Sequence, residues 1–159
     1  MKTLILVAVT ATALASGAMA QTPDARLLAP INRFIDSFNK GDVAGAKATH
    51  ANDAVILDEV PPYHWRGPKA FDTWVADLTA YDAKHGITNE AVKLGKVRRV
   101  ETSGDRGYVV VSVVYSYKQR GASVAQPAEM VVSLASGAGG WKITSWAWSG
   151  NVSRKVGVR

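Results

Sequence analysis

Two adjacent carboxylates and a histidine occur within one short stretch of the chain, ILDEVPPYHWRGPKAF at residues 56–71. Asp58 and Glu59 end an apolar run, and His64 follows two prolines. A carboxylate partly desolvated at the edge of a pocket has a raised pKa and takes a proton from carbon, and an imidazole titrates near neutral pH. Because side chains alternate along a strand, Asp58 and Glu59 point in opposite directions and share no proton. The stretch is therefore either the rim of a chemical site, in which Asp58 and His64 could carry protons, or a solvated strand end followed by a surface loop.

The composition excludes several other kinds of site. The chain has no cysteine, which rules out thiol nucleophiles and thiolate metal sites. His50, His64 and His85 lack the spacing of metal-ligand pairs, so we expect no metal site, and we identify no cofactor. The net charge is +6, with scattered basic residues and a basic tail, SRKVGVR. We interpret these charges as a solvated surface and predict no nucleic-acid partner.

The first twenty residues have the pattern of a secretory signal peptide. Lys2 precedes a mostly apolar run from Leu4 to Ala15, and the small residues Ala18 and Ala20 flank Met19. The apolar run is too short to span a bilayer, so we predict cleavage after Ala20, no stable membrane insertion, and a periplasmic or secreted protein. Residues 21–159 then form a single domain with a short basic C-terminal tail.

The remaining sequence predicts helices first and strands afterwards. Thr22 and Pro23 are typical of a helix start, and the apolar spacing that follows continues to Phe38. A short helix, a strand and a third helix come next, and four strands joined by glycine-containing turns complete the chain as an antiparallel meander. We expect these later elements at residues 43–50, 53–58, 67–86, 90–101, 108–119, 127–136 and 141–150.

Three segments resemble the nuclear transport factor 2-like superfamily, and its SnoaL-like group in particular. They are FIDSFNKGDVAGAKATHANDAVILDE, WRGPKAF and GGWKITSWAW. The resemblance implies an α+β cone, in which three N-terminal helices pack on a strongly curved antiparallel sheet. It also implies an apolar pocket for a small hydrophobic molecule in the mouth of the cone and, in many members, a homodimer through the outer sheet face.

Ketosteroid isomerase, a member of that superfamily, uses an aspartate base, a strand acid and a tyrosine. Its base corresponds to Asp58, its strand acid to Glu129 and its tyrosine to Phe34, which cannot donate a hydrogen bond. Strand alternation favours an outward Glu129, whereas the resemblance implies an inward one. Tyr115 is on the strand face that we expect to point inward. We therefore expect a pocket lined by Phe34, Phe38, Trp65, Trp74, Tyr115, Glu129 and Trp146.

These residues support two kinds of function. The first is an enzyme that transfers protons in an isomerase, cyclase or dehydratase reaction, with Asp58 as base and His64 or Tyr115 supplying the second proton. The second is a non-catalytic ligand-binding protein or a dimeric association module. The fold hosts both kinds of protein, so fold alone does not decide between them.

Overall fold

The computed structural model describes residues 23–151 and 153–156, so the predicted signal peptide and Thr22 cap lie outside the described residues. The helices precede most of the strands, as the sequence predicts. In chain order the elements are α1 (Pro23–Asn39), α2 (Val43–Ala48), β1 (His50–Leu57), β2 (His64–Arg66), α3 (Ala70–His85), β3 (Ile87–Ser103), β4 (Arg106–Gln119), β5 (Ala122–Gly137), β6 (Gly140–Gly150) and β7 (Arg154–Lys155). None of the helices within these residues is long and apolar enough to cross a membrane.

The sheet has the strand order β2-β1-β6-β5-β4-β3, and β7 pairs with β5. Strands β3 to β6 form the predicted antiparallel meander, and β1 joins β6 in parallel, with Ile56 opposite Trp146. The sequence did not predict β2, which we expected to be loop. It is three residues long and pairs with β1 through Leu57 and His64, so it is too short to show a periodic pattern.

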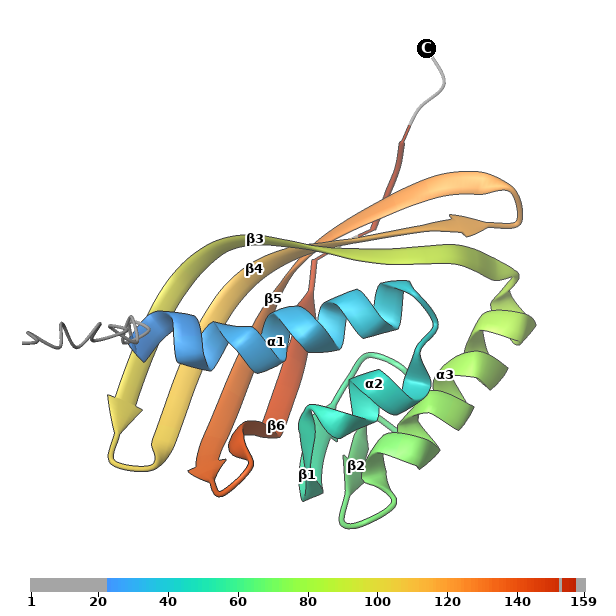
Figure 1. Ribbon diagram of the computed structural model, residues 1–159. Helices are drawn as coiled ribbons and strands as arrows, with labels where there is room; N and C mark the ends of the chain where they lie inside the picture. Colours follow the sequence, from blue (N-terminus) through green and yellow to red (C-terminus); the bar gives the residue numbers. More distant parts are fainter. Residues whose placement is uncertain (1–22, 152, 157–159) are drawn as a thin grey trace, which may run out of the picture.

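The sheet curves over α1, and α3 closes one end of the resulting hollow (Figure 1). The curvature has a local cause in β3, whose register with β4 shifts between Thr88 and Ala91 and again between Leu94 and Arg99. Irregularities of this kind bend a strand and increase its twist. The α+β cone is therefore confirmed, with its concave face turned toward the helices.

The core lies between α1 and the concave face of the sheet. Leu27, Ile31 and Phe34 recur at helical spacing along α1 and are buried. Alternate residues of the central strands meet them, which confirms the predicted inward face of β4. The fully buried strand side chains include Val109, Val111, Val113, Met130, Val132, Leu134 and Ile143.

Specific residues define the start of α2 and the end of α3. Asp42 caps α2, where its Oδ1 accepts a 2.9 Å hydrogen bond from the amide of Gly45. Gly86 ends α3 in the left-handed conformation, with φ at 65°, and its amide bonds the carbonyl of Asp82. Pro68, which we expected in the first turn of α3, lies before the helix, because α3 begins at Ala70. The Gly86 cap places Asp82 in the last turn of α3.

Candidate active-site cavity

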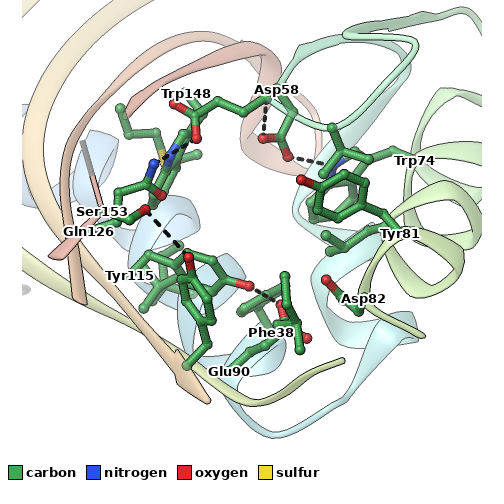
Figure 2. Close-up of a pocket in the computed structure, with 18 of the residues that line it drawn as sticks. Phe38, Asp58, Trp74, Tyr81, Asp82, Glu90, Tyr115, Gln126, Trp148 and Ser153 are labelled. Atoms are coloured by element: carbon green, nitrogen blue, oxygen red, sulfur yellow. Dashed lines mark hydrogen bonds between the residues drawn. The ribbon is translucent and has the colours of Figure 1, made fainter. Parts of the chain in front are cut away.

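A cavity of about 190 Å³ lies in the hollow between α1, α3 and the concave face of the sheet. Aromatic side chains form much of its wall, and four carboxyl groups are among its polar side chains (Figure 2). The aromatic residues are Phe34, Phe38, Trp74, Tyr81, Tyr115, Tyr117, Trp146 and Trp148, and the carboxylates are Asp58, Glu59, Asp82 and Glu90. Among the residues that the structure describes, no lysine, arginine or histidine lines this cavity.

Asp58 directly follows β1 and projects into the cavity wall. Its Oδ2 accepts a 2.7 Å hydrogen bond from the indole of Trp74, and its Oδ1 accepts a 2.6 Å bond from the amide of Glu59. Burial raises the pKa of Asp58, and the charge of Glu59 adds to this, while the two hydrogen bonds partly offset it. Each carboxylate oxygen keeps a lone pair that can accept a proton from a bound molecule.

Asp82, Glu90 and Tyr115 form a second polar group of the cavity (Figure 2). The hydroxyl of Tyr115 donates a short hydrogen bond to Oε1 of Glu90. Asp82 is only 9% exposed, and its Oδ1 has no hydrogen-bond partner among the described residues. Burial raises the pKa of Asp82 to about 7, with further contributions from the charge and hydrogen bonding of Glu90 and the charge of Asp58. Burial and Glu90 also raise the pKa of Tyr115.

Sequence reasoning missed Asp82 and Glu90. A signal for Asp82 was present, because it lies four residues after Leu78 and so falls on the apolar stripe of α3, where a carboxylate is unusual. Glu90 gave no comparable signal. It stands at the start of β3, and only the pairing of β3 with β4 brings it to Tyr115.

A buried histidine stands behind the aromatic wall. The indole of Trp146 donates to Nε2 of His50 at 3.1 Å, so Nδ1 carries the proton and bonds the carbonyl of Ala46 at 3.0 Å. The ring edge of Phe34 contacts the same imidazole, with centroids 4.8 Å apart. Burial lowers the pKa of His50 to about 4, which keeps the ring neutral. His50 therefore orients the wall rather than carrying charge.

The rim of the cavity is polar and aromatic. Gln126 donates a 2.8 Å hydrogen bond to Oε2 of Glu59, and the hydroxyl of Tyr117 lies 3.4 Å from Oγ of Ser153. The rings of Tyr115 and Trp148 meet edge to face at 6.2 Å. These side chains come from β4, β5, β6 and the segments after β1 and β6, so the meander and the end of β1 build the rim together.

The structure brings six of the predicted residues to the cavity and leaves three outside it. Those that line it are Phe34, Phe38, Asp58, Trp74, Tyr115 and Trp146. Trp65 was wrongly expected there: it is buried on β2, and its indole donates to Asp77 of α3 at 2.8 Å. Glu129 is on the outer face, 3.6 Å from Arg98, because its neighbour Met130 occupies the inner face. His64 is exposed and does not line the cavity. It lies on β2, the edge strand that pairs with β1 on the side opposite β6.

The described residues include no group of three or more histidine, cysteine, aspartate and glutamate side chains arranged to hold a metal ion. The polar side chains that line the cavity carry carboxyl, phenol, hydroxyl, indole and amide groups. One carboxyl group lies at the end of β1 and a second at the end of α3, an arrangement that could transfer a proton within a bound molecule.

No protein-family model matches the chain, and comparison with curated proteins gives no significant match. Solved structures match most of it. A ketosteroid isomerase-like protein from Erwinia carotovora atroseptica is 19% identical, with a TM-score of 0.64 over 80% of this chain and 95% of that one. A hexachlorocyclohexane dehydrochlorinase, LinA-type3, from Novosphingobium barchaimii is 15% identical, with a TM-score of 0.68 over 82% and 91% of the two chains.

A nuclear transport factor 2-like superfamily protein from Salmonella enterica matches as well, at 18% identity and a TM-score of 0.64. The match covers 82% of this chain and 92% of that one. The chain therefore has the nuclear transport factor 2-like fold, as its sequence motifs predict. Since proteins of different activity share this fold, it leaves the reaction to be argued from the cavity.

Proposed function

We propose that this protein catalyses proton transfer on a small, largely apolar molecule held in the cavity, with Asp58 as general base and Asp82 as general acid. The observation that carries this proposal is that two carboxyl groups in different environments line one aromatic cavity. Pairs of carboxyl groups whose surroundings set different pKa values are the usual means by which one site provides both a base and an acid.

Asp58 would take the proton. Its oxygens are held by Trp74 and the amide of Glu59, which fixes the carboxylate while leaving lone pairs free. Burial raises the pKa of Asp58 and so makes its carboxylate a stronger base. The electron pair left on the substrate carbon moves into an adjacent carbonyl or toward a leaving group.

Asp82 would supply the second proton. With a pKa of about 7 it is protonated in a large fraction of molecules at neutral pH, and it lies beside Glu90, whose charge discourages ionisation. Protonated Asp82 gives its proton to the developing oxyanion or to the leaving group, which leaves the charge on the Asp82–Glu90 pair. Tyr115 orients Glu90 through their hydrogen bond. This role replaces the one that the sequence suggested for His64.

The names of the matched structures fit this reaction class without specifying it. They include an isomerase-like protein and a dehydrochlorinase. Isomerisation and loss of hydrogen chloride both require a proton to leave carbon, which is the step assigned to Asp58. The pattern of residues 1–20 adds the proposal that the reaction takes place outside the cytoplasm, in the periplasm or after secretion.

Exchange of carbon-bound hydrogen tests the proposal without knowledge of the natural substrate. The purified protein is incubated in heavy water with a panel of neutral and amine-bearing aromatic ketones, and deuterium uptake is followed by mass spectrometry. We expect uptake above the buffer rate on at least one compound. Asp58→Asn should lower that rate by about 10²–10⁴-fold, the usual contribution of a general base.

Glu129→Gln, which changes a carboxylate on the outer sheet face, is the matched control and should leave the rate unchanged. Equal rates in the wild type and Asp58→Asn would contradict the assignment of the base. A compound that binds tightly to both proteins without exchange would instead favour the alternative function, a non-catalytic binding protein. The two hydrogen bonds that already engage Asp58 are the observation that favours that alternative. Association through the outer sheet face remains a separate prediction, tested by the oligomeric state.

A further inference from the structure

The cavity is strongly acidic within a basic protein. The chain has a formal net charge of +6, yet the carboxylates Asp58, Glu59, Asp82 and Glu90 all line the cavity and no basic side chain of the described residues does. The ion pairs among the described residues lie elsewhere and join Lys47 to Asp72, Arg98 to Glu129, Arg99 to Glu101 and Asp105 to Arg106. The described residues therefore place no basic side chain beside the cavity carboxylates.

One carboxyl oxygen of Asp82 lacks a hydrogen-bond donor as well as a basic partner among the described residues. The side chain is 9% exposed, it lines the cavity, and its Oδ1 has no hydrogen-bond partner in the described part of the chain. Figure 2 shows its carboxyl group directed toward the space between the lining side chains, next to Tyr81 and near Glu90. A buried polar oxygen without a partner is destabilising, and a ligand that donates to it would relieve that cost.

The remaining wall suits a positive charge. The rings of Tyr115 and Tyr117 lie 4.8 Å apart, and Trp148 meets Tyr115 edge to face at 6.2 Å. Trp74 and Trp146 form a second aromatic pair, with centroids 5.1 Å apart. The faces of indole and phenol rings carry negative charge density and attract ammonium groups, most strongly where water is excluded.

We propose that the molecule bound in this cavity is an organic cation, an amine or quaternary ammonium compound whose charged group lies between the aromatic rings and the Asp82–Glu90 pair. This inference rests on the proposed function and names the chemical class of its substrate. It differs from the expectation of a small hydrophobic molecule, because carboxyl groups without a basic partner among the described residues favour a positively charged ligand.

A cationic substrate is also consistent with the proposed proton transfer. An ammonium group withdraws electrons and so makes neighbouring carbon-bound hydrogens more acidic, which assists removal of the proton by Asp58. The same positive charge favours ionisation of Asp82 and makes it a stronger proton donor. The substrate would thus contribute to lowering the barrier on both sides of the cavity.

A pair of probes that differ only in charge tests the inference by binding alone. Choline and 3,3-dimethylbutan-1-ol have the same shape, because a quaternary carbon replaces the nitrogen. Titrations of the purified protein, followed by tryptophan fluorescence and by saturation-transfer NMR, give the two dissociation constants. We expect choline to bind about tenfold or more tightly than the alcohol.

Variants then assign the preference to the cavity. Glu90→Gln keeps the side-chain shape and should lower the affinity for choline about tenfold, with little effect on the alcohol. Trp148→Leu, which removes an aromatic face, should also lower the choline affinity more than that of the alcohol. Glu129→Gln removes one negative charge from the outer sheet face and controls for the net charge of the protein, so its probe affinities should match the wild type.

The outcomes separate the two proposals. An alcohol affinity equal to or greater than that of choline would overturn the cation inference while leaving proton transfer on a neutral molecule intact. The same choline affinity in Glu90→Gln and the wild type would also overturn it. Selective choline binding together with unchanged deuterium uptake in Asp58→Asn would support the cation and reject the proton-transfer function. Binding of neither probe at millimolar concentration would overturn the cation inference and remove support for the cavity as a ligand site.

Discussion

The indole Nε1 of Trp74 lies 2.7 Å from Oδ2 of Asp58 and donates a hydrogen bond to it. This contact ties α3 to the end of β1 and holds the carboxylate at the cavity wall. It also opposes the effect of burial, because a donor to the ionised form lowers the pKa that desolvation raises. Trp74 therefore both orients the candidate base and limits its basicity.

Replacement of Trp74 by phenylalanine tests this relationship. Trp74→Phe removes the donor, so the pKa of Asp58 should rise further above its ordinary value. The measurement is a carboxyl-carbon NMR titration of Asp58. Trp65→Phe is the matched control, because the indole of Trp65 donates an equivalent 2.8 Å bond to Asp77, outside the cavity. An unchanged Asp58 titration in Trp74→Phe, or the same shift in both variants, would contradict the assignment.

Asp82 should make the protein less stable as the pH rises. The folded protein holds the Asp82 proton to about pH 7, whereas an unfolded chain releases it near the ordinary pKa of 3.8. Unfolding between these values releases a proton, so this group lowers stability as the pH increases through the window. Glu90 of β3 and Asp58 beyond β1 are the negative charges that act on it. Asp82→Asn should therefore raise the free energy of unfolding more at pH 8 than at pH 5.

Denaturant titrations of the wild type and Asp82→Asn at the two pH values measure this difference. Asp36→Asn, a change at an exposed position of α1, controls for the loss of one carboxylate elsewhere. The interpretation fails if Asp82→Asn changes stability by the same amount at both pH values, or if Asp36→Asn shows the same pH dependence.

Much of the fold was predictable from the sequence because its signals are local. Helical spacing in α1 and α3, glycine at the end of α3 and glycine-containing turns between long strands all follow from adjacent residues. The strand β2 was missed because three residues between prolines and Gly67 carry no period. The parallel pairing of β1 with β6 joins distant segments and has no local sign.

The cavity was predictable only where one strand or helix determines a side chain's direction. Alternation along β5 correctly placed Glu129 outside and Met130 inside. Asp58 was placed at the cavity by the resemblance to ketosteroid isomerase, because its position at the end of an apolar strand alone also allowed a solvated carboxylate. Glu90 meets Tyr115 only through tertiary pairing, and its contact has no signature in nearby residues. His64 and Trp65 were misplaced because the direction of a short edge strand depends on its partner, and β2 pairs with the outer side of β1.

His50 should remain neutral well below the ordinary histidine range. Its pKa is lowered from 6.5 to about 4, and Trp146 fixes the tautomer with the proton on Nδ1. Since the unfolded chain takes up this proton first, the contribution of His50 to stability is present above pH 6.5 and is lost as the pH falls to about 4. The lost contribution is roughly 3 kcal/mol. Nitrogen NMR of the ring should show the Nδ1-protonated neutral form at pH 6.

His50→Gln should remove that acid sensitivity, so the free energy of unfolding of the wild type should fall relative to that of the variant as the pH drops from 6.5 to 4. Asp82 contributes an opposite pH dependence to both proteins in this range. The difference between their free energies of unfolding therefore reports His50 alone. His64→Gln changes an exposed histidine on β2 and should leave the profile as it is. A charged His50 ring at pH 6, or the same pH-dependent difference from the wild type in His64→Gln, would contradict the assignment.

Gly150, at the end of β6, leaves room for the rim of the cavity. A Cβ atom at this position would collide with Oε1 of Glu59 and with Nε2 of Gln126, the two side chains joined by a hydrogen bond across the rim. Both atoms are at the ends of flexible side chains, so Gly150→Ala should displace them rather than unfold the protein, with a stability change below about 1 kcal/mol. The added Cβ should separate Glu59 from Gln126 and break their hydrogen bond, which should shift the side-chain amide signals of Gln126 in NMR spectra. Gly137→Ala in β5 is the control, because its added Cβ meets nothing within 4 Å. Unchanged side-chain amide signals of Gln126 in Gly150→Ala would show that the rim does not depend on this glycine.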